Sequence, residues 1–163
     1  SNYDGETKVK AAKILEELHC PFVINQNRYS IFDRTIEKNG ILDAAISEKK
    51  GMIIFSPLEQ GLLTDRYLKG IPEDSRVRTD GRFLKESSIT EDKLAKIKKL
   101  NDIAKNRGQT LAQMALSWIY SKKGITSVLI GASKPEQILD NLKMAENLEF
   151  TKEELTQIDN IVL

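Results

Sequence analysis

Cysteine and an excess of either charge are the first things that this sequence lacks. One cysteine, Cys20, among 163 residues excludes an internal disulfide framework. The 25 Lys and Arg residues nearly balance the 24 Asp and Glu residues and are mixed with them along the chain. The resulting net charge of +1 creates no field that would attract nucleic acid or an anionic membrane. We therefore expect neither of them as a partner.

Long apolar runs and a leader sequence are also missing. No apolar run approaches the roughly 20 residues that a membrane span needs. The first residues, SNYDGETK, contain neither the basic n-region nor the apolar h-region of a signal peptide. We therefore expect a cytoplasmic protein.

Motifs for metal binding and nucleophilic catalysis are absent as well. The sequence has no CxxC or HExxH spacing and no GxGxxG, so we predict no metal site and no Rossmann nucleotide site. His19 and Cys20 are neighbours, but no acidic residue is evidently placed to orient the histidine. They follow a predicted helix and precede a strand, which is the end of a barrel opposite its active site. We predict no catalytic role for this pair.

What the sequence does have is an alternation of short β-rich runs with longer helical segments. The first two strands are about 30 residues apart with a helix between them, the spacing of a βαβ unit with parallel strands. Ser1-Asn2-Tyr3 has the character of a frayed strand end. We therefore expect an α/β fold with helices outside a parallel sheet. The predicted helices span 8–19, 34–49, 91–107, 110–120 and a last segment from Thr151, and the predicted strands span 21–26, 52–55 and 127–130.

The length limits how much of a parallel α/β fold the chain can hold. Its 163 residues, 40% of them apolar, are enough for one globular unit with a real core. A complete (β/α)8 barrel, however, needs roughly 250 residues. We therefore treat residues 1–163 as a single partial domain. Its stretch of about 63–90, rich in Gly, Pro and Arg, predicts a long loop, and such loops usually carry function.

The predicted strands end in residues suited to binding. Gln26 ends the first strand with an amide that can bond a carboxamide, although loop amides are common. Phe55 ends the second with a ring that can stack on a heterocycle or simply pack in the core, and Ser56 adds a hydroxyl. After the third strand, Gly131 and Ser133 belong to a turn whose small residues admit a phosphate or merely suit a βα turn. Since parallel α/β proteins bind ligands at the carboxyl ends of their strands, we expect one site there.

Two further features border this expected site. The segment Ser133-Lys134-Pro135-Glu136 predicts a capping box with proline in the first turn of a helix. The long loop carries arginines that either clamp phosphates or are only solvated. They are Arg66, Arg76, Arg78 and Arg82.

Two segments, FSPLEQGLLTDRYLKGIPEDSR (55–76) and TSVLIGASKPEQILDN (126–141), resemble the aldo-keto reductases in this order and at this separation. The likeness covers essentially the whole chain. It is closest to the branch that contains the L-glyceraldehyde 3-phosphate (methylglyoxal) reductases and the β-subunits of voltage-gated potassium channels. The resemblance implies the C-terminal half of a (β/α)8 TIM barrel, from the end of its fifth strand to its last helices. It also implies a nicotinamide cofactor, NADP.

The resemblance assigns cofactor roles residue by residue. Many family members place an arginine on the 2′-phosphate where this chain has Gln137, and the branch named above shares the glutamine. The implied nicotinamide residues are Ser1, Asn2, Gln26 and Phe55; those of the pyrophosphate loop are Ser56, Leu58, Gln60, Gly61 and Arg66; Arg76 is implied near the adenosine; and Ser133, Gln137, Asp140 and Asn141 are implied at the 2′-phosphate and adenine.

The family's catalytic tetrad of Asp, Tyr, Lys and His belongs to the first half of the barrel, so none of its positions exists in this sequence. We therefore expect no catalytic residue and no activity from this chain alone. The resemblance implies an intact parent that reduces small aldehydes or ketones with NADPH, completed by an N-terminal half-barrel. Two alternatives stay open. The chain could be a stand-alone nucleotide-binding or assembly module that pairs with a second copy, or a regulatory protein like the channel β-subunits.

Overall fold

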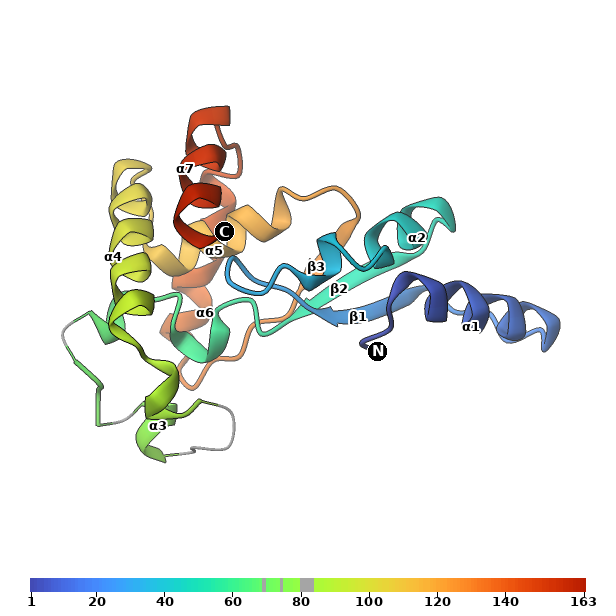
Figure 1. Cartoon of the computed structure of the whole chain (residues 1–163), viewed down its shortest axis with the longest axis horizontal. Helices are drawn as coiled ribbons and strands as arrows, with labels where there is room; N and C mark the ends of the chain where they lie inside the picture. Colours follow the sequence, from blue (N-terminus) through green and yellow to red (C-terminus); the bar gives the residue numbers. More distant parts are fainter. Residues whose placement is uncertain (69, 74, 80–83) are drawn as a thin grey trace. The chain divides into compact units, whose positions relative to one another are not determined.

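A computed structural model describes residues 1–68, 70–73, 75–79 and 84–163 (Figure 1). The chain divides into two compact units. We refer to Ser1–Pro57 with Ile119–Gly131 as the sheet unit, and to Leu58–Trp118 with Ala132–Leu163 as the helical unit.

Three parallel strands form the centre of the sheet unit, in the order β1 (Ile24–Arg28), β2 (Gly51–Phe55) and β3 (Ile125–Val128). The expected α/β class and parallel pairing are confirmed. β1 begins and ends later than predicted, and β3 begins and ends two residues earlier. The arrows of β1 and β2 run side by side in Figure 1.

The shift of β1 has a local cause. Its first paired residue is Ile24, opposite Gly51, and Pro21 precedes it without an N–H to donate to a ladder. At the other end the pairing continues past the predicted last residue, because Asn27 is held on the buried face. Its Nδ2 donates to Tyr3 O at 3.0 Å and its Oδ1 accepts from Asn25 Nδ2. These contacts override the low strand propensity of asparagine.

The helix α1 (Gly5–Glu17) begins three residues before the predicted start. Asp4 caps it by accepting the N–H of Thr7 at 2.8 Å, and this bond lowers the pKa of the Asp4 carboxyl. Gly5 lies so close to the Gly40 turn that an added Cβ would be 2.6 Å from the Gly40 carbonyl. Only glycine fits at position 5.

The predicted helix 34–49 is wrong as a continuous element. The structure has a short 3-10 turn, η1 (Thr35–Glu37), and then α2 (Ile41–Ser47). Gly40 separates them with φ of 76°, a left-handed conformation that ends a regular helix. The apolar periodicity on which the prediction rested continues through both pieces.

The helical unit contains three long elements, α4 (Glu91–Asn106), α5 (Leu111–Tyr120, which ends two residues beyond the unit) and α7 (Lys152–Val162). Their predicted bounds agree within one residue. α4 and α7 lie beside one another (Figure 1), and α7 begins with a capping box formed by Thr151 and Glu154. The shorter elements are η2 (Glu59–Gly61), η3 (Asp65–Tyr67), α3 (Arg76–Thr79), η4 (Glu86–Ser88), α6 (Pro135–Leu142) and η5 (Lys143–Glu146).

The capping box predicted for Ser133 and Glu136 does not form. The N-cap of α6 is Lys134, and its side chain makes no cap bond. Pro135 does occupy the first turn, as predicted. No helix in the described parts of the chain combines the length and the apolar character that crossing a membrane requires.

The ion pair of Lys8 with Glu48 joins α1 to the end of α2. The Lys8 side chain is 1% exposed and that of Glu48 22%. The ammonium of Lys8 also lies 5.5 Å from the centroid of the Phe22 ring, and that of Lys50 lies 4.7 Å from the same centroid.

Replacing Lys8 by methionine therefore leaves the Glu48 carboxylate partly buried without its partner. We expect the free energy of unfolding to fall by about 1–3 kcal/mol, below the range for fully buried pairs because Glu48 keeps some contact with water. Urea denaturation of the protein measures this. The matched control is Lys10→Met, which breaks an exposed pair with Glu6 and should cost at most about 0.5 kcal/mol. An equal fall in the free energy of unfolding in the two variants would contradict a stabilising role of the buried Lys8–Glu48 ion pair.

Candidate functional site

The parallel sheet brings two of the three predicted strand ends to one edge. Phe55 is the last residue of β2, and Gly131 follows the end of β3 by three residues. Gln26 is not at the end of its strand as predicted, because β1 continues to Arg28. It pairs with Ile53, two residues before Phe55. Phe55 and Gly131 thus lie at the carboxyl edge of the sheet, whereas Gln26 lies two residues before the end of β1.

The N-terminal residues lie against Gln26. The Ser1 hydroxyl donates to the Gln26 carbonyl oxygen at 3.1 Å, and the Asn2 N–H donates to the same oxygen at 2.8 Å. Asn2 has φ of 59°, an uncommon left-handed conformation. Three of the residues predicted to hold a nicotinamide are therefore neighbours in the sheet unit.

One face of the sheet remains partly uncovered. Side chains alternate between faces along a strand, so Gln26, Ile53 and Phe55 share a face by their register. All three are only partly buried, whereas Met52 and Ile54 on the opposite face are fully buried. Both faces of a parallel sheet normally need cover. The face that carries Gln26 and Phe55 is thus the one available to a ligand or to further polypeptide.

The turn after β2 is held in a left-handed conformation. Ser56 has φ of 55°, Glu59 of 48°, Gln60 of 58° and Gly61 of 96°. Three non-glycine residues of this kind within six positions carry a conformational cost, and such residues cluster at binding sites. Glu59 is also buried, and nothing in the sequence singled it out.

The residues that follow this turn are tied back to it. Leu58 O accepts from the N–H groups of Gly61 at 2.8 Å and Leu63 at 3.1 Å, and Gly61 O accepts from the Thr64 hydroxyl at 2.6 Å. Thr64 caps the η3 turn that contains Arg66, whose side chain is exposed. The predicted pyrophosphate residues of the helical unit therefore form a locally bonded loop.

At the start of α6, Gln137 takes the donors that were predicted for a phosphate. Its Oε1 accepts from the Ser133 N–H at 2.8 Å and from the Ser133 hydroxyl at 3.3 Å. This bond replaces the predicted capping box. The carboxamide oxygen thus occupies the acceptor position that a phosphate oxygen would take at this helix start.

Further along α6, Asp140 and Asn141 differ in their surroundings. Gln113 Nε2 donates to Asp140 Oδ1 at 2.9 Å and to the Asp140 carbonyl oxygen at 3.0 Å. Asn141 is 8% exposed, and its carboxamide makes no hydrogen bond with any residue that the structure describes. Its amide atoms are not among the fully buried polar atoms that lack a partner, so they stay open to water or to a ligand.

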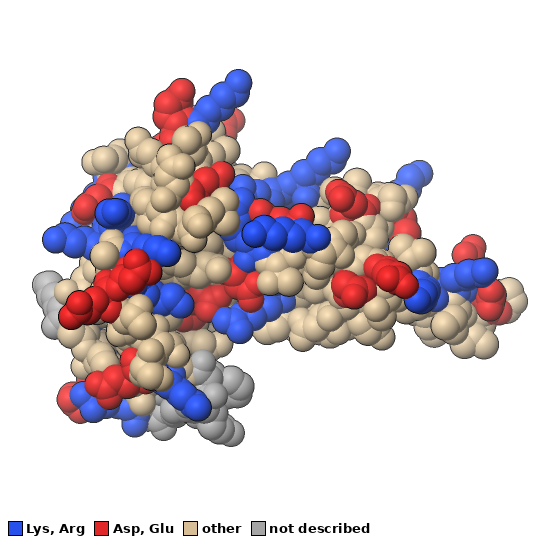
Figure 2. All heavy atoms as spheres, viewed as in Figure 1, with Lys and Arg blue, Asp and Glu red and all other residues tan. Residues whose placement is uncertain are grey.

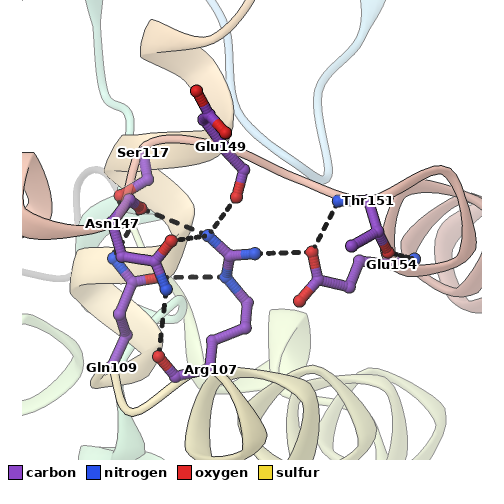
Figure 3. A network of polar contacts seen from close by, with 7 residues as sticks. All are labelled: Arg107, Gln109, Ser117, Asn147, Glu149, Thr151 and Glu154. Atoms are coloured by element: carbon purple, nitrogen blue, oxygen red, sulfur yellow. Dashed lines mark hydrogen bonds and ion pairs between the residues drawn. The ribbon is translucent and has the colours of Figure 1, made fainter.

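The polar network around Arg107 is an anchor within the helical unit (Figure 3). The guanidinium donates to Glu154 Oε2 at 2.6 Å, to Glu149 O at 2.9 Å and to Gln109 Oε1 at 3.0 Å. Its Cζ lies 3.7 Å from the centroid of the Phe150 ring. These contacts fix the segment before α7 to the end of α4.

The charged side chains on the surface are of both signs, as the balanced composition of the sequence predicts. Lys and Arg are interspersed with Asp and Glu on the face that Figure 2 shows. Arg76 begins α3, Arg78 is exposed, and Arg82 lies outside the described residues. Within the described ranges, no three His, Cys, Asp or Glu residues are grouped as a metal site requires.

Comparisons with known proteins identify a family for the chain. The model of the aldo/keto reductase family matches residues 1–163. The chain is 44% identical over 162 residues to the L-glyceraldehyde 3-phosphate reductases of Escherichia coli O157:H7 and of strain K12, covering 98% of this chain and 47% of each relative. It is 34% identical over 143 residues to a probable voltage-gated potassium channel subunit beta of Oryza sativa subsp. japonica, covering 86% of this chain and 44% of that protein. The chain thus spans about half the length of these relatives.

The left-handed turn gives a direct test of the loop geometry. We expect Gln60→Val to lower the free energy of unfolding by about 1–3 kcal/mol more than Gln60→Gly does, because a β-branched residue resists positive φ. Both variants lose the same side-chain contacts, so their difference in urea denaturation isolates the backbone. Equal stability of the two variants would contradict the conformation described here.

Proposed function

Because the chain belongs to the aldo/keto reductase family, we propose that it is the NADP-binding half of a cytoplasmic reductase of small aldehydes or ketones. The observation that carries the proposal is the partly uncovered sheet face with Gln26 and Phe55, beside which Ser1 and Asn2 bond to Gln26. A flat ring with a carboxamide suits this set of groups. The Phe55 ring offers stacking, and the amides offer a donor and an acceptor.

The pyrophosphate belongs, in this proposal, to the left-handed turn. Ser56 supplies a hydroxyl, and the positive φ angles of Glu59, Gln60 and Gly61 bend the backbone into a tight loop beside it, in which the Gly61 N–H already bonds to Leu58 O. Arg66, exposed in the next turn, adds a guanidinium for the same charge.

In this proposal the adenosine end belongs to α6 and to Arg76 of the long loop. Ser133 would exchange its bond with Gln137 for one with the 2′-phosphate, while Gln137 turns its amide to donate. Asp140 supplies an acceptor and Asn141 an amide for the adenine. Gly131 leaves room for the backbone to approach the dinucleotide. The preference for NADP rests on Ser133 and Gln137.

When bound, the dinucleotide supplies the hydride for the carbonyl carbon. The proton for the carbonyl oxygen needs an acid within hydrogen-bond reach, which commonly contributes about 10² to 10⁴-fold to a rate. The four tyrosines of the chain do not match that acid. Tyr29 is fully buried with its hydroxyl bonded to Glu37, and Tyr67 is 3% exposed. The acid therefore comes from the other half of the parent protein.

We expect the 163-residue chain to bind NADPH, measured by fluorescence titration, without reducing carbonyl compounds. Phe55→Leu should raise the Kd about 5- to 10-fold because the stacking ring is lost, and Phe55→Tyr should leave it near the wild-type value. Turnover of an aldehyde by the chain alone, or an unchanged Kd in Phe55→Leu, would contradict the proposal.

The same proposal requires a partner for the sheet unit. Val9, Ile14 and Leu18 expose apolar side chains on α1 and its C-cap, and Val23 does so just before the edge strand β1. Exposed apolar patches and unpaired strand edges mark interaction surfaces. We assign this surface to the N-terminal half-barrel of the parent, with a second copy of the chain as the alternative.

We expect a separately produced N-terminal half of the parent to form a 1:1 complex with the chain, measured by sedimentation velocity. The double variant Ile14→Lys/Leu18→Lys should abolish the complex, because two charges would be buried. Leu163→Lys, at another exposed apolar residue outside this surface, is the control. If the chain forms a concentration-dependent dimer and does not bind the N-terminal half, the surface pairs with a second copy of the chain instead.

A further inference from the structure

A row of buried polar side chains runs along α5 and the residues before it. Gln113 and Ser117 are four residues apart and lie on one side of α5, and Gln109, just before the helix, donates from Nε2 to Ser117 Oγ at 3.0 Å. Each of the three is less than 8% exposed, and the other positions of α5 are mostly apolar. Buried polar groups need partners, and these three find them on α6 and the chain that follows it.

The contacts of this row proceed in order along the facing segment. Gln113 bonds to Asp140, Ser117 Oγ donates to Met144 O at 2.9 Å, and Gln109 Nε2 donates to Asn147 O at 3.1 Å. The apolar side chains of α6, in contrast, are exposed: Ile138, Leu139 and Leu142. The placement of α6 within the helical unit therefore depends on the polar row more than on apolar packing.

Gln113 has a definite orientation in this row. Its Oε1 accepts from the Thr110 N–H at 3.0 Å, which directs the Nε2 group to α6. Both bonds of that group go to Asp140, one to the carbonyl oxygen and one to Oδ1. The ammonium of Lys143 also lies 3.8 Å from Oδ1. Asp140 Oδ2 accepts no hydrogen bond from the described residues and stays available.

We propose that Gln113 is a positioning residue for the adenosine end of the dinucleotide, acting through Asp140. This inference rests on the proposed function of α6. By holding Oδ1 and the main chain of Asp140, Gln113 fixes the direction of Oδ2 and the rotation of the helix turn that carries Asn141. A side chain ordered before binding loses less conformational freedom when the ligand arrives, which strengthens binding without a direct contact.

The test uses 2′,5′-ADP, which carries only the adenosine end, and reduced nicotinamide mononucleotide, which carries only the other end. We expect Gln113→Glu, which keeps the shape but turns the donor into an acceptor facing a carboxylate, to raise the Kd for 2′,5′-ADP and NADPH about tenfold. The Kd for the mononucleotide should not change. An unchanged Kd for 2′,5′-ADP in a folded variant would overturn the inference.

Two further variants separate positioning from general stability. Ser117→Ala removes the neighbouring bond of the same row and should lower the unfolding temperature while changing the Kd for 2′,5′-ADP less than twofold. A tenfold loss there would also overturn the inference. If Gln113→Glu does not fold, Gln113→Met replaces it in a double-mutant cycle with Asp140→Ala. Non-additive losses support action through Asp140, and additive losses refute it.

Failure of the inference can be distinguished from failure of the proposed function. If the wild-type chain binds neither NADPH nor 2′,5′-ADP, the proposed function fails and the inference falls with it. If the wild type binds both and the Gln113 variants bind equally well, only the inference fails.

Discussion

Parallel pairing of β1, β2 and β3 is the constraint on which the candidate site depends. Parallel strands start and end at the same edges of a sheet, so the residues after β2 and β3 meet at one edge however far apart they are in sequence. The register then puts Gln26 and Phe55 on one face. Helix α2 covers β2, while the Gln26 face remains partly uncovered. A shift of one residue in β1 would turn Gln26 to the covered face.

The helical unit meets a different requirement, the precise presentation of short polar segments. The turn at Glu59 and Gln60 keeps a costly backbone conformation, and the row from Gln109 to Ser117 holds α6 through hydrogen bonds. Arg107 secures the chain after that row. Interactions of this kind specify direction, whereas apolar packing mainly specifies proximity. The dinucleotide site that we propose here would need that directional control, because it has to match the polar atoms of the ligand.

The elements that sequence alone predicted well are those with complete local signals. Helix α7 has its capping box at Thr151, and α4 and α5 have long apolar periodicity separated by Gly108, whose φ is 68°. The predictions were wrong where contacts between residues far apart in the sequence determine the local structure. Asn27 extends β1 because Tyr3 binds it, and Gln137 reaches back to Ser133 in place of Glu136. The cofactor roles predicted for the site residues stay predictions, and no sequence pattern indicated the left-handed turn or the orientation of Gln113.

The most direct measurement is hydrogen–deuterium exchange of the backbone amides with and without saturating NADPH. If this chain is the dinucleotide-binding half of an aldo/keto reductase, exchange should slow in two separate stretches, residues 56–61 and 131–141, and remain unchanged in α1. NADPH that slows exchange in neither stretch, or only around α1, would contradict the assignment.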